Sequence, residues 1–260
     1  MDDRQNLRSQ QALTLAADAA ALLLASGAET SRAQETAEIL FRAFGTGELQ
    51  AYVLTNGVIA VPLEHSLPGG VRNVPNSSVN LTRVAAVNEL SRQIAAGGLT
   101  LDEAEAQLAR AQRIPFPNAW VQLVAGLSGA FCFAMIFGGT LRAGLAAAVA
   151  GLAANGYLLL CERLHLPGGF RKITTASLIT LVCLPLCHLL GTEASHAIIG
   201  TLMILTPGIA FTMGIRDFVQ GDYLSGTIRM IDALLVAACI AIGTGFVLWC
   251  YSLLTGVNIA

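Results

Sequence analysis

Charged side chains are scarce in this chain of 260 residues. Only 12% of the residues are charged, whereas 54% are hydrophobic, and the mean hydropathy is +0.63. A soluble domain carries roughly a quarter charged residues, so this chain has too few to cover the surface of one. The net charge of −2 and the 6% of aromatic residues also disfavour nucleic acid as a partner, because nucleic-acid binding needs a basic face. The apolar excess therefore predicts the lipid bilayer as a partner.

Motifs for ATP binding, hydrolysis and metal binding are also missing. The sequence has no G-x-x-x-x-G-K-[ST], no G-x-S-x-G, no H-E-x-x-H and no paired C-x-x-C. Cys183, Cys187 and His188 lack a fourth ligand, and all six cysteines lie after residue 117, where thiols in lipid act as small apolar side chains. We therefore predict no catalytic residue, no metal and no cofactor.

The charges that are present divide the chain in two. Residues 1–117 hold nine Arg and twelve acidic residues, whereas residues 118–260 hold six basic and five acidic residues among long apolar runs. The boundary falls near Pro115 and Pro117, which would stop a helix. The polar start of the chain does not resemble a secretory signal. We predict a cytoplasmic α+β domain over residues 1–117 and a transmembrane domain over residues 118–260.

Local patterns give the elements of the first domain. Helices are predicted over residues 7–25, 30–44 and 80–96, with Ser26 and Gly27 ending the first. Thr100 and Glu103 form a capping-box pattern for a fourth helix that ends near residue 112. Extended segments are predicted over residues 49–64 and 70–74, with a hairpin turn at Asn56-Gly57.

The second domain contains about five apolar segments long enough to cross a bilayer. They cover residues 120–138, 143–161, 174–190, 197–214 and 230–254, and the third contains Pro185. Seven basic residues lie in the connections on one side and only Arg142 on the other. The positive-inside rule then puts the N-terminus in the cytoplasm and the C-terminus in the periplasm, as in a multi-pass inner-membrane protein. The predicted fold class is an α-helical polytopic membrane protein with an N-terminal cytoplasmic α+β domain.

The sequence Thr206-Pro207-Gly208 interrupts the fourth predicted span. Proline removes a backbone donor, and an interrupted helix is tolerated in hydrocarbon only where protein or water satisfies the freed carbonyls. Transporters use such interruptions to direct helix ends toward a substrate. A simple proline kink without a ligand is the alternative.

Charged residues follow this interruption. Placing a charged side chain against lipid costs roughly several kcal/mol of free energy. Ionisable residues near a span are therefore candidates for a functional role by default. Arg216 or Arg229 could hold a substrate carboxylate while Asp217 or Asp232 relays a proton. Alternatively, the arginines extend to the inner interface and the aspartates pair with them.

Two further groups of polar residues are candidates. Asn155 continues a stripe of small residues in the second span, which indicates helix packing, although its amide could also line a pathway. In the first domain, caps and turns account for most polar residues. The alternative is a small polar site, whose members would be Glu29, Arg32, Ser78, Asn80 and Arg83.

An ordered set of motifs resembles the threonine/serine exporter family over nearly the whole chain. The motifs are Ser26-Gly-Ala-Glu-Thr-Ser-Arg32; Asn80-Leu with Arg83, Asn88 and Ser91-Arg92; Thr206-Pro-Gly208 with Gly214-Ile-Arg-Asp217; and Gly221-Asp-Tyr-Leu-Ser-Gly226 with Arg229. The chain is similar to the half-size members, in which a second short membrane protein supplies the rest, because it ends at Ala260 without a second membrane half. The resemblance implies export of succinate and related C4 dicarboxylates for half-size pairs, and of threonine and serine for fused members.

The sequence thus predicts one subunit of a two-component inner-membrane secondary exporter of small carboxylate substrates, with succinate as the main expectation and a proton or anion gradient as the driver. Five spans are few for a substrate pathway, and carriers are commonly built from paired repeats, which also favours a partner. The alternatives are a threonine/serine exporter subunit, a membrane-anchored hydrolase acting through the first domain, and an accessory subunit that only stabilises its partner.

Overall fold

The structure is a computed structural model that describes residues 3–44, 47–63, 67–74 and 78–256. Its backbone forms two compact units. The first unit contains Met1–Phe116 and Met213–Arg229, and the second contains Pro117–Thr212 and Met230–Ala260. The composition of the sequence predicts one transmembrane domain for residues 118–260. In the structure, however, residues 213–229 pack with the N-terminal residues, because their charged side chains find partners there.

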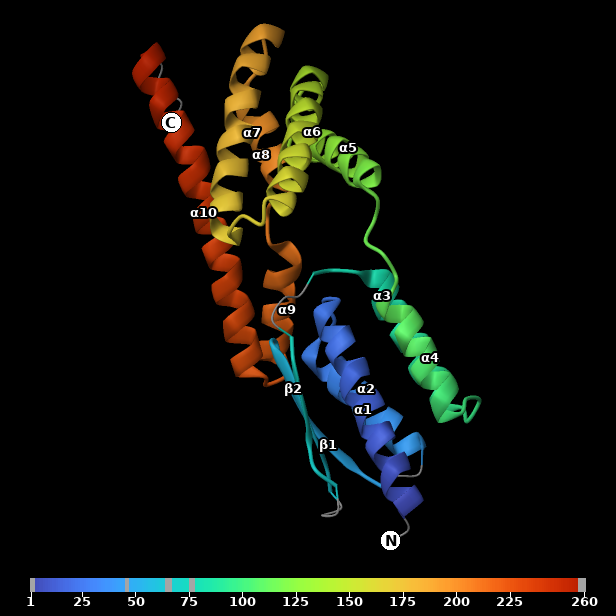
Figure 1. Cartoon of the computed structure of the whole chain (residues 1–260). Coiled ribbons are helices and arrows are strands. Elements are labelled where there is room, and N and C mark those ends of the chain that lie inside the picture. Colours follow the sequence, from blue (N-terminus) through green and yellow to red (C-terminus); the bar gives the residue numbers. More distant parts are fainter. Residues whose placement is uncertain (1–2, 45–46, 64–66, 75–77, 257–260) are drawn as a thin grey trace. The chain divides into compact units, whose positions relative to one another are not determined.

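The first unit has helices and a small sheet (Figure 1). The strands are antiparallel in the order β1-β2-β3, and the pair Leu54 and Gly57 encloses a turn at Thr55-Asn56, one residue before the turn predicted at Asn56-Gly57. The predicted extended segment 49–64 is therefore two strands, and its last residue lies outside the described residues. The elements are α1 (Asp3–Ala25), α2 (Thr30–Ala43), β1 (Leu49–Leu54), β2 (Gly57–Pro62), β3 (Gly70–Asn73), α3 (Leu81–Ala95) and α4 (Leu101–Gln112).

Local signals fix several ends of these helices, although α1 begins at Asp3, four residues before its predicted start at residue 7. The capping box at Thr100 and Glu103 is present, and Asn80 caps α3 by accepting from the backbone N–H of Arg83. Gly27 ends α1 with a φ of +82°, and a Cβ at this position would meet Val79 at 3.2 Å. A residue other than glycine is disfavoured there, because left-handed backbone strains L side chains.

The second unit contains α5 (Ala119–Ile136), α6 (Leu141–Arg163), α7 (Gly168–Leu190) and α8 (Ala194–Leu202). Two further helices, α9 (Gly208–Val219) and α10 (Tyr223–Thr255), begin in one unit and end in the other. Among the residues that the structure describes, four helices are long and apolar enough to cross a membrane, namely α5, α6, α7 and α10. The chain is therefore an α-helical multi-pass membrane protein.

The fourth predicted span does not form one helix. Residues 197–214 divide between α8, which ends at Leu202, and α9, which begins at Gly208. The physical reason is Pro207, which has no N–H to donate to the preceding turn. The interruption predicted within the fourth span is confirmed, and the fourth span itself stays a prediction, because neither α8 nor α9 is long enough to cross a membrane as a single helix. Pro185, by contrast, lies within the continuous helix α7.

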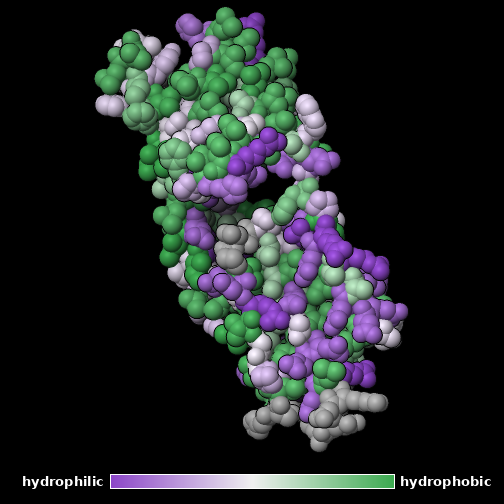
Figure 2. All heavy atoms as spheres, in the orientation of Figure 1, coloured by the Kyte–Doolittle hydropathy of each residue, from purple (hydrophilic) through white to green (hydrophobic). Residues whose placement is uncertain are grey.

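Small residues hold the second unit together. A Cβ at Gly200 would lie 2.4 Å from the backbone nitrogen of Ala134, and one at Gly151 would lie 2.5 Å from the carbonyl oxygen of Gly126. Helices in lipid approach closely through such residues. Large apolar side chains such as Leu145 are exposed instead. On the face shown in Figure 2, hydrophobic residues cover much of this unit, and hydrophilic residues gather over the first.

Candidate functional site

The interruption between α8 and α9 leaves backbone groups without partners. Within the described residues, no donor reaches the carbonyl oxygens of Ile204 and Leu205, and the N–H groups of Ile209 and Ala210 find no acceptor. Short-range bonds such as that from the N–H of Gly208 to the carbonyl of Thr206 satisfy only part of the turn. Unsatisfied backbone groups are costly in hydrocarbon, so this turn needs water, a ligand or another protein beside it.

A cavity of about 420 Å³ lies beside this turn in the second unit. Its wall is mostly apolar. The hydroxyl of Thr206 donates to the carbonyl of Leu202 at 3.2 Å. The hydroxyl oxygen of Thr244 on α10 is buried and has no hydrogen-bond partner within the described residues. The lining residues are Leu202, Thr206, Pro207, Ala237, Ile240, Ala241, Thr244, Gly245 and Leu248.

Thr244 is a candidate site residue that the sequence analysis missed. It lies in an apolar run without a neighbouring motif, so no local signal marks it. Thr206 and Pro207 were predicted and do line the cavity, whereas Gly208 is exposed at the start of α9 and is not among the lining residues.

The predicted charged residues after the interruption form ion pairs in the first unit. Arg216 contacts Glu29 at 2.6 Å, and the Nε of Arg229 lies 3.0 Å from a carboxylate oxygen of Asp217. Arg229 also donates to the carbonyl of Ala28 at 3.3 Å. Both arginines are therefore already neutralised by carboxylates. Asp217 thus pairs with an arginine, as in the alternative in which the aspartates pair with the arginines. The partner of Arg216 is instead Glu29, from the motif Ser26–Arg32.

Asp217 is the most deeply buried of these charges. Its side chain is 1% exposed, and neither carboxylate oxygen accepts a well-directed hydrogen bond within the described residues. Burial raises the pKa of Asp217 above its ordinary value, and the nearby Arg229 charge opposes this shift without cancelling it. The pair is therefore strained electrostatically, because the carboxylate loses its hydration and gains only one counter-charge.

Asp232 and Asn155 lie elsewhere. Asp232 is exposed on the part of α10 that belongs to the second unit. Asn155 of α6 donates to the carbonyl of Gly151, and a Cβ at Gly126 of α5 would overlap its amide. Neither residue lines the cavity at Thr206.

The five polar residues proposed as one site in the first domain have separate partners. Arg32 contacts Asn88 and Glu35, and Arg83 donates to the carbonyl of Ile114. The backbone N–H of Ser78 bonds to Ala25, Asn80 caps α3, and only Glu29 joins the charged residues after the interruption.

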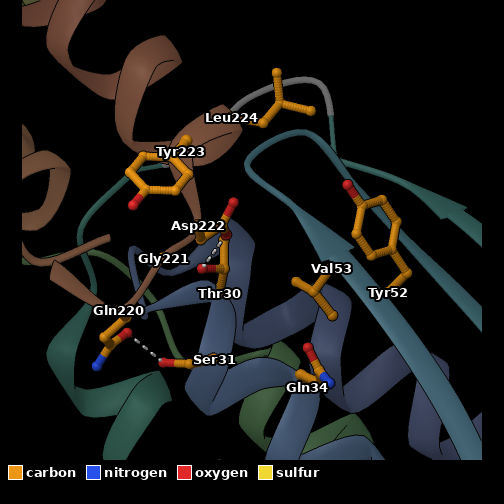
Figure 3. Close-up of a pocket in the computed structure, with 10 residues that line it drawn as sticks. All are labelled: Thr30, Ser31, Gln34, Tyr52, Val53, Gln220, Gly221, Asp222, Tyr223 and Leu224. Atoms are coloured by element: carbon orange, nitrogen blue, oxygen red, sulfur yellow. Dashed lines mark hydrogen bonds between the residues drawn. The ribbon is translucent and has the colours of Figure 1, made fainter. Parts of the chain in front are cut away.

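A second cavity, of about 510 Å³, lies within the first unit (Figure 3). The hydroxyl of Thr30 donates to Asp222 at 3.1 Å, and that of Ser31 donates to Gln220 at 3.1 Å. Two motifs that are 192 positions apart thus meet here. The sequence marked both motifs, but no local pattern could pair them. The lining residues are Thr30, Ser31, Gln34, Tyr52, Val53, Gln220, Gly221, Asp222, Tyr223 and Leu224.

The chain has helices long enough to span a membrane, an interrupted helix beside a cavity, and a charged α+β unit. These features place it among membrane proteins with a solute-sized cavity in their helical unit. The family model described as "Putative threonine/serine exporter" matches residues 14–251, and the chain belongs to this family. The resemblance seen in the motifs is therefore confirmed.

The chain is also similar to a protein of Mycobacterium tuberculosis (strain ATCC 25618 / H37Rv) named "Probable threonine/serine exporter". The two are 25% identical over 242 residues, which is 92% of this chain and 46% of the relative. The chain thus spans about half the length of the curated relative it matches. No solved structure matches it.

Proposed function

We propose that this chain is one part of a membrane exporter for small hydroxy amino acids, threonine and serine. The family description and the name of the relative support this alternative better than succinate or another C4 dicarboxylate, which was the main expectation from the sequence. Both kinds of substrate carry a carboxylate, so an arginine alone does not distinguish them.

The interrupted helix is the observation that carries the proposal. Residues 203–207 separate two helices beside a cavity of about 420 Å³ that Thr206, Pro207 and Thr244 help to line, and the residues with free backbone groups flank Thr206 and Pro207 along the chain. Carriers use interrupted helices to present backbone donors and carbonyls to a substrate within the membrane. An amino acid offers a carboxylate for the free N–H groups of α9 and an ammonium for the free carbonyls.

We also propose that a second membrane component completes the pathway. The relative is about twice as long as this chain, so the matching region is half of that protein. Thr206 and Ile209 are exposed at the interruption. A partner helix packed over this surface would cover the free backbone groups, as lipid could not.

The proposed orientation has the first unit in the cytoplasm and the chain in the inner membrane. The excess of basic residues in the connections on that side supports it. An exporter in this orientation takes its substrate from the side of the first unit.

Efflux from cells tests the proposal. Cells that lack this chain are complemented with the wild-type chain or a variant, together with the chromosomal partner, and extracellular threonine, serine and succinate are measured after loading. We expect restored threonine and serine efflux with the wild type, and at least a tenfold reduction with Pro207→Ala or Thr244→Val. Pro185→Ala is the matched control, because Pro185 lies in a continuous helix and does not line the cavity.

The alternatives give different results. If succinate efflux is restored without threonine or serine efflux, the substrate is a C4 dicarboxylate and not a hydroxy amino acid. Full activity of Pro207→Ala and Thr244→Val would indicate an accessory subunit. Hydrolysis of a metabolite by the purified chain, with no change in efflux, would favour the hydrolase alternative.

A further inference from the structure

We propose that the cavity between α2, β1 and the α9–α10 connection is a second binding site, which takes the ammonium group of a small amino acid against Asp222. This inference rests on the proposed function for its choice of ligand. The cavity volume of about 510 Å³ is ample for a threonine molecule. The cavity lies within one compact unit, so all of its walls belong to the same packed body.

The cavity has a negatively charged side chain in its lining and no positively charged one. Asp222 is the one ionisable carboxylate among the ten lining residues, and none of the ten is Lys, Arg or His. The lining therefore offers a negative charge without a basic counter-charge of its own. An ammonium group supplies that counter-charge, whereas a dicarboxylate would bring a like charge to Asp222.

Hydrogen bonds hold the Asp222 carboxylate in place before any ligand binds. One oxygen of Asp222 accepts from Thr30 at 3.1 Å, and the other accepts from the backbone N–H of Ser225 at 3.2 Å. Each carboxylate oxygen can accept a further hydrogen bond. The side chain is half-buried and held from two elements, so a ligand finds it already in position.

The neighbouring amides suit the rest of an amino acid. Gln220 accepts from Ser31 through its carbonyl oxygen, which leaves its NH₂ group able to donate to a carboxylate. Gln34 donates to Glu38 through its NH₂ group, which leaves its carbonyl oxygen able to accept from a hydroxyl. In Figure 3, Tyr223 lies on one side of the Thr30–Asp222 hydrogen bond and Tyr52 on the other. Aromatic faces attract ammonium groups.

Helix capping is the simpler role for Asp222. It caps α10 through Ser225. A cap needs an acceptor and not a charge, and asparagine and serine cap about as well as aspartate. Asp222→Asn and Asp222→Ser therefore keep the cap and remove the proposed counter-ion, which separates the two roles.

Calorimetric binding to the purified full-length chain in lipid nanodiscs tests the site. The probes are L-threonine, threoninol, which keeps the ammonium and lacks the carboxylate, and succinate. We expect the wild type to bind L-threonine and threoninol but not succinate. Asp222→Asn and Asp222→Ser should weaken L-threonine binding at least tenfold, with thermal unfolding close to that of the wild type. The control is Asp102→Asn, which removes a carboxylate from the same unit outside this cavity.

A Thr206→Val variant separates this site from the cavity in the second unit. We expect Thr206→Val to keep the wild-type affinity for L-threonine, and the addition of Asp222→Asn to this variant to weaken the binding at least tenfold. The inference is overturned if the wild type and both Asp222 variants bind L-threonine with equal affinity. It is also overturned if the wild type binds succinate as tightly as L-threonine, or if the wild type does not bind L-threonine. If threonine efflux persists with any of these results, the proposed function stands without this site. If binding behaves as expected but efflux of threonine is absent, the site stands and the proposed function fails.

Discussion

The two units differ in how many large apolar side chains their cores contain. The first unit encloses large apolar residues such as Phe41, Leu15 and Leu23. The interior of the second unit is rich in alanine, including Ala134 and Ala147, while large apolar side chains are exposed on its surface. The interior of the first unit is therefore filled by larger side chains than the interior of the second.

The difference follows from the two solvents. In water, burial of a large apolar side chain stabilises the fold by about 1.5–3 kcal/mol, so such residues collect inside. Lipid tails are as apolar as leucine, so burial of leucine in a membrane unit gives no such gain. Close approach of backbones then contributes the stability, and small residues permit it.

The largest effect should come from enlarging a glycine in the second unit. In Gly200→Ala, the new Cβ would lie 2.4 Å from the backbone nitrogen of Ala134, so α8 must move away from α5. We expect a loss of more than about 3 kcal/mol in stability, at the upper end for overpacking. Gly129→Ala is the control, because no described atom beyond its chain neighbours and the nearby backbone of its own helix lies within 4 Å of the added Cβ. Thermal unfolding in detergent measures both, and equal midpoints would contradict this account of the packing.

The next largest loss of stability should come from the buried ion pair in the first unit, and it should differ between substitution of Arg229 and substitution of Asp217. Arg229→Met leaves the Asp217 carboxylate buried without its counter-charge, which should cost about 3 kcal/mol at pH 7. Asp217→Asn should cost little, because burial already favours the neutral form and raises the pKa of Asp217. The double variant should recover most of the loss. Unfolding midpoints of the three variants in detergent check this, and an equal loss in both single variants would contradict it.

The same pair predicts a pH dependence. A carboxyl whose pKa is raised on folding contributes stability that is fully present below its ordinary value of 3.8 and is lost as pH rises through the folded value. Asp217→Asn lacks this group. Its unfolding midpoint should therefore rise relative to that of the wild type as the pH increases from about 4. A difference that stays constant with pH would show that folding does not shift this carboxyl.

A smaller effect belongs to the capping box of α4. Thr100→Ala removes the hydroxyl that accepts from the backbone N–H of Glu103, which should cost about 1 kcal/mol. Thr100 also holds the pKa of Glu103 below its usual range through hydrogen bonds. Thr100→Ser keeps the hydroxyl and should behave as the wild type in thermal unfolding. Loss of stability in both variants would assign the effect to packing of the methyl group.

The smallest effect is expected for the exposed ion pair. Arg216 is 55% exposed, so Glu29→Gln should change stability by less than about 1 kcal/mol, and the change should shrink in high salt. Reversal of both charges, Glu29→Arg with Arg216→Glu, should restore the wild-type unfolding midpoint. A large loss that the reversed pair does not recover would mean that Glu29 acts on something other than Arg216.

Local chemistry made much of the fold predictable. The hairpin between β1 and β2, the capping box at Thr100 and the interruption at Pro207 each depend on residues close together in sequence. The small-residue stripe around Asn155 was also interpreted as packing, and it lies against α5. The cavity residue Thr244 was not predicted, because a hydroxyl in a long apolar helix has no local pattern.

By itself, the sequence determined which segments are helices, which helices are apolar enough for a bilayer, and where the chain cannot continue a helix. These properties follow from side-chain hydropathy and from the backbone limits of proline and glycine, which act over a few residues. Only the tertiary structure decided that residues 213–229 pack with the N-terminal unit, and that Thr30 meets Asp222 and Glu29 meets Arg216. Such pairings depend on how packed elements bring distant side chains together, and charge alone would have allowed many other partners.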